Sequence, residues 1–257
     1  MNSLIIMASV FVTVFFGGLI GLQLQRILPE ACTTGGPRDM VGAVTGLVTL
    51  LLALVLGLLI WTAFGVYSTQ KASIQTMAIG DLKLDAALKE LGPEGAEGRQ
   101  LLKAGIARTI TQIWGGGYDG DFVMKNYQFA LANVAERETF LNGIHLSTDK
   151  QKAAQAAAVQ AANSIGQARV QMAVALVDPV SYPLLVIVVI WATCLFCGYG
   201  LLSKSHPMSY VALMVGALAI ASAIEVIVDL SDPYQGFFLV SPGALTDVIK
   251  AIDATPS

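Results

Sequence analysis

Three carboxylates lie at the end of the last long apolar stretch of the chain and are the side chains best placed for ion chemistry. Glu225 and Asp229 are four residues apart and share one face of a helix, and Asp232 begins a turn at an Asp-Pro pair. One interpretation is that they mark a membrane boundary and pair with Lys71 or Arg169. The other is an acidic mouth that concentrates cations, as rings of carboxylates do in channels.

The thiols and imidazoles do not form a pattern typical of catalysis. Cys194 and Cys197 form a CxxC inside an apolar stretch, whereas a redox CxxC needs an accessible helix terminus and a metal site needs more ligands. We interpret both as packing residues, and Cys32 stands alone. His145 and His206 are far apart, and the chain has no phosphate-binding loop, dinucleotide fingerprint or hydrolase motif. The sequence predicts neither an enzyme nor a cofactor or metal site.

The composition is that of a membrane protein. Of 257 residues, 55% are hydrophobic and 13% are charged, against roughly a quarter charged in soluble domains. The net charge of −3, without a basic cluster, argues against a nucleic-acid partner. Apolar windows long enough to span a bilayer cover residues 1–25, 40–70, 179–203 and 207–224. The first lacks a basic residue before Arg26, so we expect a retained span and not a cleaved signal.

These windows predict an all-α, polytopic membrane protein with four transmembrane helices and a helical extramembrane region between the second and the third. We divide it into residues 1–70 (spans 1 and 2), 71–178 (extramembrane helices), 179–228 (spans 3 and 4) and 229–257 (a turn and a short helix). Both termini and the extramembrane region are then on one side of the membrane. Basic residues near the span ends are equally numerous on the two sides, so charge bias does not orient the protein.

Extramembrane helices are expected over residues 72–91, 96–114, 123–141 and 148–176, with a Gly-Pro break at 92–95 and a flexible glycine-rich loop at 115–121. Thr148 and Gln151 have the spacing of a capping box. The last of these helices is expected to continue, or to kink at Pro179, into the third span. A final helix begins near Ser241-Pro242 and ends at about residue 252.

Small residues and one charge pair are predicted to hold the helices together. Gly17 with Gly21, and Gly42 with Gly46, have the GxxxG spacing that lets helix backbones approach closely in a bilayer. They pack either within one subunit or between subunits, and we expect a homo-oligomer. Asp85 and Arg169 each lie among apolar neighbours, where a charge is usually paired, so we predict an ion pair between them.

Five segments of the chain together resemble bacterial membrane proteins described as bestrophin-like domain proteins. They read LPEA at 28–31, LVLGLLI at 54–60, LKLDAALKELGPEGAEGRQLL at 82–102, GQAR at 166–169 and DPYQGFFLVSPGAL at 232–245. The resemblance covers nearly the whole chain. It implies four spans, a cytoplasmic helical part, location in the bacterial inner membrane and, by analogy, assembly into a pentamer.

Ion conduction is the function that this resemblance implies. Bestrophins are channels with a hydrophobic neck in the second span, and the resemblance implies that Ile60 and Phe64 form such a neck here, although the next turn carries Ser68. We therefore expect an oligomeric, bestrophin-like channel for small inorganic ions with a preference for cations. The alternative is a non-conducting scaffold or sensor whose helical region binds a protein partner.

Overall fold

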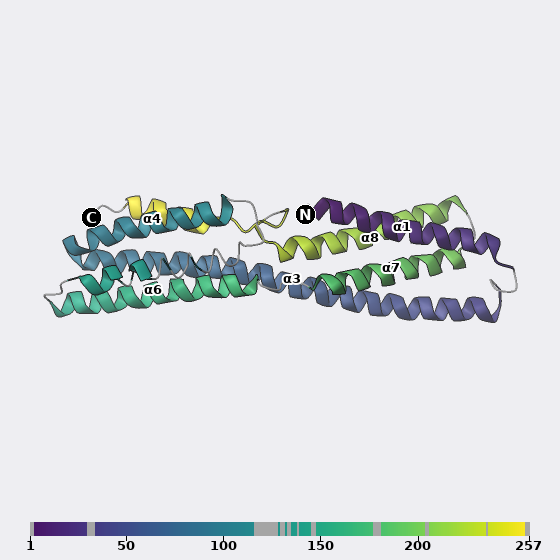
Figure 1. Ribbon diagram of the computed structural model, residues 1–257, viewed down its shortest axis with the longest axis horizontal. Helices are drawn as coiled ribbons and strands as arrows, with labels where there is room; N and C mark the ends of the chain where they lie inside the picture. The colour runs from purple at the N-terminus through teal and green to yellow at the C-terminus, as the bar shows by residue number, and fades with distance from the viewer. Residues whose placement is uncertain are drawn as a thin grey trace. The chain divides into compact units, whose positions relative to one another are not determined.

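The computed structural model describes residues 3–29, 34–115, 128, 132, 135–137, 139–144, 148–176, 181–203, 206–234 and 236–254. Regular secondary structure in these residues is helical, which confirms the predicted all-α class. The helices are α1 (Ser3–Ile27), α3 (Gly36–Glu90), the short 3-10 helix η1 (Gly92–Glu94), α4 (Gly95–Trp114), α6 (Asp149–Ala175), α7 (Tyr182–Leu202), α8 (Pro207–Ser231) and α9 (Gly243–Ala254), shown in Figure 1.

The chain forms two compact units. The membrane unit comprises Met1–Gly65 and Pro179–Ser231, and the helical unit comprises Val66–Asp178 and Asp232–Ser257. Four helices, α1, α3, α7 and α8, are long and apolar enough to cross a bilayer, as predicted. A helix satisfies its own backbone hydrogen bonds, so such segments are stable in hydrocarbon.

Contacts of α7 set the relative directions of three spans in the membrane unit. Gly17 and Gly21 of α1 lie against Thr193 and Cys197 of α7, in the same order along both helices, so α1 and α7 run parallel. The Thr49 hydroxyl near the start of α3 is 2.8 Å from the hydroxyl of Tyr199 at the end of α7. The first part of α3 therefore lies beside the last part of α7.

Contacts of α8 show that the four helices of the membrane unit alternate in direction along the chain. Arg26 at the end of α1 donates a hydrogen bond of 3.5 Å to the hydroxyl of Tyr210 at the start of α8, so these two helices are antiparallel. Both connections within the membrane unit therefore lie at one end of its bundle. The N-terminus and the three points where the chain passes to or from the helical unit lie at the other end, as the four-span topology requires.

Helix α3 continues past Lys71, where the sequence analysis separates the second span from the first extramembrane helix. The sequence predicts a span ending at residue 70 and a separate helix over 72–91, whereas α3 is one helix of 55 residues. Lys71 ends the apolar stretch without disfavouring helical backbone, because lysine is a good helix former and no proline occurs between residues 38 and 92. α3 stops where sequence breakers do occur, at Gly92, whose φ of +72° favours glycine, and Pro93.

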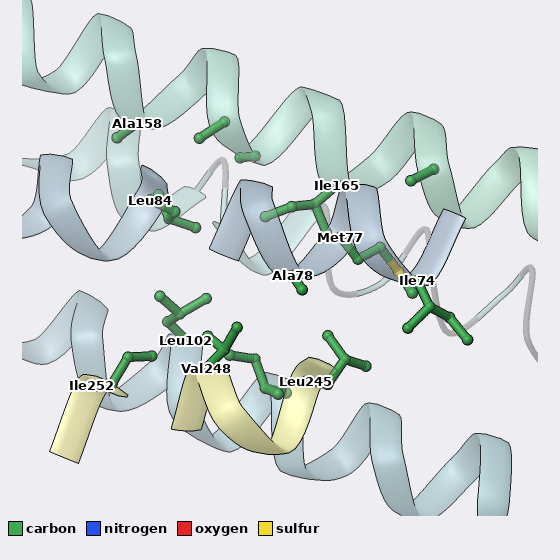
Figure 2. Packing of buried hydrophobic residues seen from close by; sticks show 14 of the residues in the cluster. Ile74, Met77, Ala78, Leu84, Leu102, Ala158, Ile165, Leu245, Val248 and Ile252 are labelled. Carbon is green, nitrogen blue, oxygen red and sulfur yellow. The ribbon is translucent and has the colours of Figure 1, made fainter. Parts of the chain in front are cut away.

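The helical unit has its own hydrophobic core, which α3, α4, α6 and α9 share. Figure 2 shows apolar side chains from these helices turned toward one another: Ile74, Met77, Ala78 and Leu84 of α3, Leu102 of α4, Ala158 and Ile165 of α6, and Leu245, Val248 and Ile252 of α9. The predicted capping box at Thr148 and Gln151 is present at the start of α6. The core thus holds together segments that are far apart in the sequence.

Several predictions fall on residues outside those described. Most of the predicted helix over 123–141 is among them, although residues 135–137 and 139–143 are helical. The glycine-rich loop beyond residue 115, Cys32, His145 and the predicted continuation or kink at Pro179 are also outside the described residues. Helix α8 extends seven residues past the predicted end of the fourth span, to Ser231.

Candidate functional site

One face of α3 in the membrane unit combines small residues with the predicted neck residues. A side chain added at Gly42, Gly46 or Gly57 would have no neighbouring atom within 4 Å. At 100° per residue, these glycines and the two neck residues fall within about 60° of one another around the helix axis. The face, here called the glycine face, consists of Gly42, Gly46, Gly57, Ile60 and Phe64.

The other predicted glycine pair is used inside the subunit. A Cβ at Gly17 would lie 2.7 Å from Cγ2 and 2.9 Å from the carbonyl oxygen of Thr193, and one at Gly21 would overlap the carbonyl of Cys197. Two GxxxG motifs that look alike in the sequence are therefore different in the structure. Gly17 and Gly21 let α1 pack on α7, whereas a Cβ at Gly42 or Gly46 would have no neighbour within 4 Å in the described part of the chain.

Ile60 and Phe64, the neck residues, come last in sequence among the residues of the glycine face. Ile60 is half-buried, Phe64 is half-exposed, and Ser68 one turn later is exposed. An apolar side chain on an outward face can contact lipid, a neighbouring subunit or a pore. The assignment of Ile60 and Phe64 to a neck stays a prediction.

The three carboxylates differ in how far they reach solvent. Asp229 is buried, with 3% of its surface exposed, whereas Glu225 and Asp232 are partly exposed. The Oε1 atom of Glu225 is buried and accepts no hydrogen bond from the described residues. Within one chain, Glu225 is therefore a better candidate than Asp229 for a side chain that faces an ion path.

Asp85 is paired, as predicted for a buried carboxylate, but with partners other than Arg169. Its Oδ1 accepts a hydrogen bond of 2.7 Å from Arg99 Nε, and its Oδ2 lies 3.3 Å from Lys89 Nζ. Arg99 also donates to the carbonyl of Ile252 in α9, at 3.3 Å. The structure corrects the predicted partner because the nearest cations come from the next turn of α3 and from α4, which sequence separation alone could not rank.

Arg169 belongs to a second buried group of charges in the helical unit. It donates a hydrogen bond to the hydroxyl of Thr109, and the carboxylate that acts on it is Asp81. Asp81 Oδ1 also lies 3.8 Å from Arg137 Nη2. Burial, together with the charge of Arg137, lowers the pKa of Arg169 to about 10, so this guanidinium remains protonated at neutral pH.

Burial raises the pKa of Asp81 from 3.8 to about 6, although Arg137 and Arg169 act in the opposite direction. Because the folded-state pKa is above the unfolded one, the contribution to stability is complete below about pH 4 and is lost as the pH rises through 6. We expect the free energy of unfolding of the wild type to increase by up to about 3 kcal/mol between pH 7 and pH 4 from this group. The Asp81→Asn variant should lack this increase in the free energy of unfolding between pH 7 and pH 4.

Unfolding in detergent at several pH values, followed by fluorescence, measures the effect. Asp149→Asn, which removes an exposed carboxylate at the start of α6, is the matched control and should keep the wild-type pH profile. Identical profiles for the wild type and Asp81→Asn would contradict an elevated pKa at Asp81.

Comparison with known proteins identifies the family. The family model for the bestrophin-like domain matches residues 7–245, which is nearly the whole chain. The chain belongs to the bestrophin-like family. No match was found among curated proteins or among solved structures. With its four apolar helices, this bestrophin-like chain is an integral membrane protein.

A polar contact that the sequence analysis missed joins three segments of this bestrophin-like protein. Gln70 is fully buried; its Nε2 donates to the carbonyl of Met172 in α6 at 2.8 Å, and its Oε1 accepts a bond of 2.7 Å from the Tyr234 hydroxyl. Tyr234 packs edge-on against Trp114, whose Nε1 donates to the carbonyl of Val240. The only feature of the sequence that could have indicated this contact is a glutamine directly after an apolar span.

Two free thiols and the groupings of possible metal ligands are the remaining candidates for site chemistry in this bestrophin-like chain. Among the described residues, no three His, Cys, Asp or Glu side chains lie close enough together to hold a metal ion. Cys194 is exposed and Cys197 is partly buried on α7, and both are free thiols. The candidate functional residues are those of the glycine face of α3 and, separately, the carboxylates Glu225 and Asp229 of α8.

Proposed function

We propose that the protein is an oligomeric ion channel in which copies of the chain assemble around the glycine face of α3. The observation that carries the proposal is the contrast between the two glycine pairs. Gly17 and Gly21 are covered by α7, whereas a Cβ at Gly42, Gly46 or Gly57 would have no neighbour within 4 Å in the described residues. Small residues in spans allow helices to pack closely, so an uncovered row of them fits a neighbouring helix better than lipid.

Assembly around α3 would place Ile60 and Phe64 toward the axis of the oligomer. They share the glycine face, and a ring of such side chains would narrow a pore with apolar groups that gate by excluding water. Membership of the bestrophin-like family supports this arrangement. We further propose that the termini and the helical unit are cytoplasmic and that the membrane is the bacterial inner membrane.

Cation preference is the finer part of this proposal. If Glu225 and Asp229 of several subunits surround one mouth, their charges lie within a Debye length of one another, roughly 8 Å at physiological salt, and enrich cations there. Since Asp229 is buried, Glu225 is expected to contribute most of this effect.

Reversal potentials in planar bilayers under a salt gradient test the proposal. We expect purified wild-type protein to conduct with a preference for cations, and Glu225→Gln with Asp229→Asn to reduce that preference, most clearly at low ionic strength. The matched control is Asp39→Asn, which removes one exposed carboxylate at the opposite end of the bundle and should change selectivity little. Equal reversal potentials for the wild type and the double variant would contradict the acidic mouth, and an absence of current would contradict the channel.

A second candidate function is a non-conducting scaffold, which a groove in the helical unit favours. The groove lies between α3 and α6 and is lined by Lys83, Ala86, Glu90, Gln160 and Ser164, among others. Its mixture of charged and small side chains is compatible with a protein partner. An intact oligomer that carries no current would make this candidate the better one.

A further inference from the structure

The segment that follows α8 forms a closed loop with an apolar tip. Within residues 232–234 and 236–240, here called the aromatic loop, the backbone N–H of Val240 donates to the carbonyl of Pro233 at 2.9 Å. Gly236 has a φ of +101°, which side chains other than glycine rarely permit, and so allows the chain to reverse direction. The tip consists of the next three residues, Phe237, Phe238 and Leu239.

All three tip residues are exposed although they are large and apolar. The exposed fractions are 76% for Phe237, 44% for Phe238 and 54% for Leu239. Removing such side chains from water is worth about 1.5–3 kcal/mol each, so three in succession on a surface indicate a partner that covers them. By contrast, the residues at the base of the loop, Tyr234 and Val240, belong to the buried core of the helical unit.

Chain connectivity places the loop close to the membrane. Phe237 is six residues past Ser231, the last residue of the span α8, which limits their separation to roughly 20 Å. The base of the loop is held within the helical unit, where the Tyr234 hydroxyl donates to Gln70 Oε1 at 2.7 Å. The short connection to α8 alone therefore limits how far the tip can lie from the end of that span.

We propose that the tip of the aromatic loop inserts into the interfacial layer of the lipid bilayer and anchors the helical unit to the membrane surface. Aromatic and long aliphatic side chains are favoured in this layer, where apolar groups meet headgroups. The loop has one acidic residue, Asp232, and no Lys or Arg. Its affinity therefore comes from apolar insertion and does not require anionic lipids. This anchor does not depend on ion conduction.

Depth-dependent quenching tests the anchor in the full-length protein. Cys32, Cys194 and Cys197 are replaced by alanine, and Phe237→Cys is labelled with an environment-sensitive fluorophore in phosphatidylcholine vesicles. The matched control is Asp149→Cys, an exposed position on α6 that is 23 residues, or about 35 Å of helix, from Met172. We expect a blue-shifted spectrum at position 237 and quenching by spin-labelled lipids severalfold stronger than at position 149, unchanged by high salt or by added anionic lipid.

Two results would overturn the proposal. Quenching at position 237 equal to that at position 149 would show that the tip does not reach lipid. A blue shift that persists in detergent but is not quenched by spin-labelled lipids would show that another copy of the chain, and not the bilayer, covers the tip. Because the label replaces an exposed side chain, a folded protein is expected in both variants. The same quenching measurement with a label at Leu239→Cys tests the tip at a second position.

Discussion

Leucine at Gly42 and Gly46 is expected to leave the protein folded but to reduce or abolish its assembly. A Cβ added at either glycine would have no neighbour within 4 Å in the described residues, so we expect the single chain to keep its fold. Between subunits they would hold two backbones apart, and the packing that drives helix association in lipid would be lost. The mass of the protein in detergent, measured by light scattering, should therefore fall toward that of a single 27.0 kDa chain.

The matched variant carries leucine at Gly17 and Gly21, which have the same spacing. Here the new side chains would overlap the backbone of Thr193 and Cys197, and overpacking costs about 1–3 kcal/mol per site even where neighbours can move. We expect loss of folded protein and not a change of mass. An oligomer of unchanged mass for the Gly42/Gly46 variant would contradict assembly through the glycine face.

Removal of the Asp85 carboxylate is expected to destabilise the helical unit by about 3 kcal/mol or more. Asp85→Asn removes a carboxylate 2.7 Å from Arg99, whose side chain is only 11% exposed, and losing the charged partner of such a group is strongly destabilising. The same arginine bonds the carbonyl of Ile252, so the effect should extend to α9. Hydrogen exchange in α4 and α9 should become faster, and the unfolding midpoint should decrease.

The exposed pair between Lys103 and Asp253 is the control for this experiment. Its contact of 2.5 Å is shorter than the 2.7 Å between Asp85 and Arg99, but its side chains are 46% and 53% exposed. Asp253→Asn should lower the free energy of unfolding by less than about 1 kcal/mol. Replacing Asp85 and Arg99 together by Leu and Met should recover part of the stability, because the charge then left over, on Lys89, is 32% exposed and can be hydrated. Equal effects of the Asp85 and Asp253 variants would mean that the burial of the pair is unimportant.

The sequence predicted the class of the fold because hydropathy reports directly on the solvent around a helix. The four spans, the capping box at Thr148 and the break after Glu90 all follow from local properties of the residues. The error at Lys71 has a simple cause. A charge marks where a helix leaves the hydrocarbon layer, but not where the helix itself ends, so one long helix was read as two.

The candidate site was less predictable because it depends on which faces of the helices meet. GxxxG spacing identified both glycine pairs, but only the neighbouring helix decides that Gly21 is covered and Gly46 is not. Similarly, apolar neighbours indicated that Asp85 is paired, yet Arg99 and Arg169 were equally plausible partners without the fold. Gln70 could not be recognised, since its two partners are 102 and 164 residues away in the sequence.

The buried amide at position 70 has a consequence for which residues this position can accept. Its nitrogen donates to a backbone carbonyl of α6, and its oxygen accepts from the hydroxyl of Tyr234. Only a side chain that donates and accepts at once can serve both partners without bringing a charge into the core, which excludes Glu, Lys and every apolar residue. Position 70 should therefore vary far less among related chains than the exposed lysine beside it, although neither residue belongs to the face on which the chain would assemble.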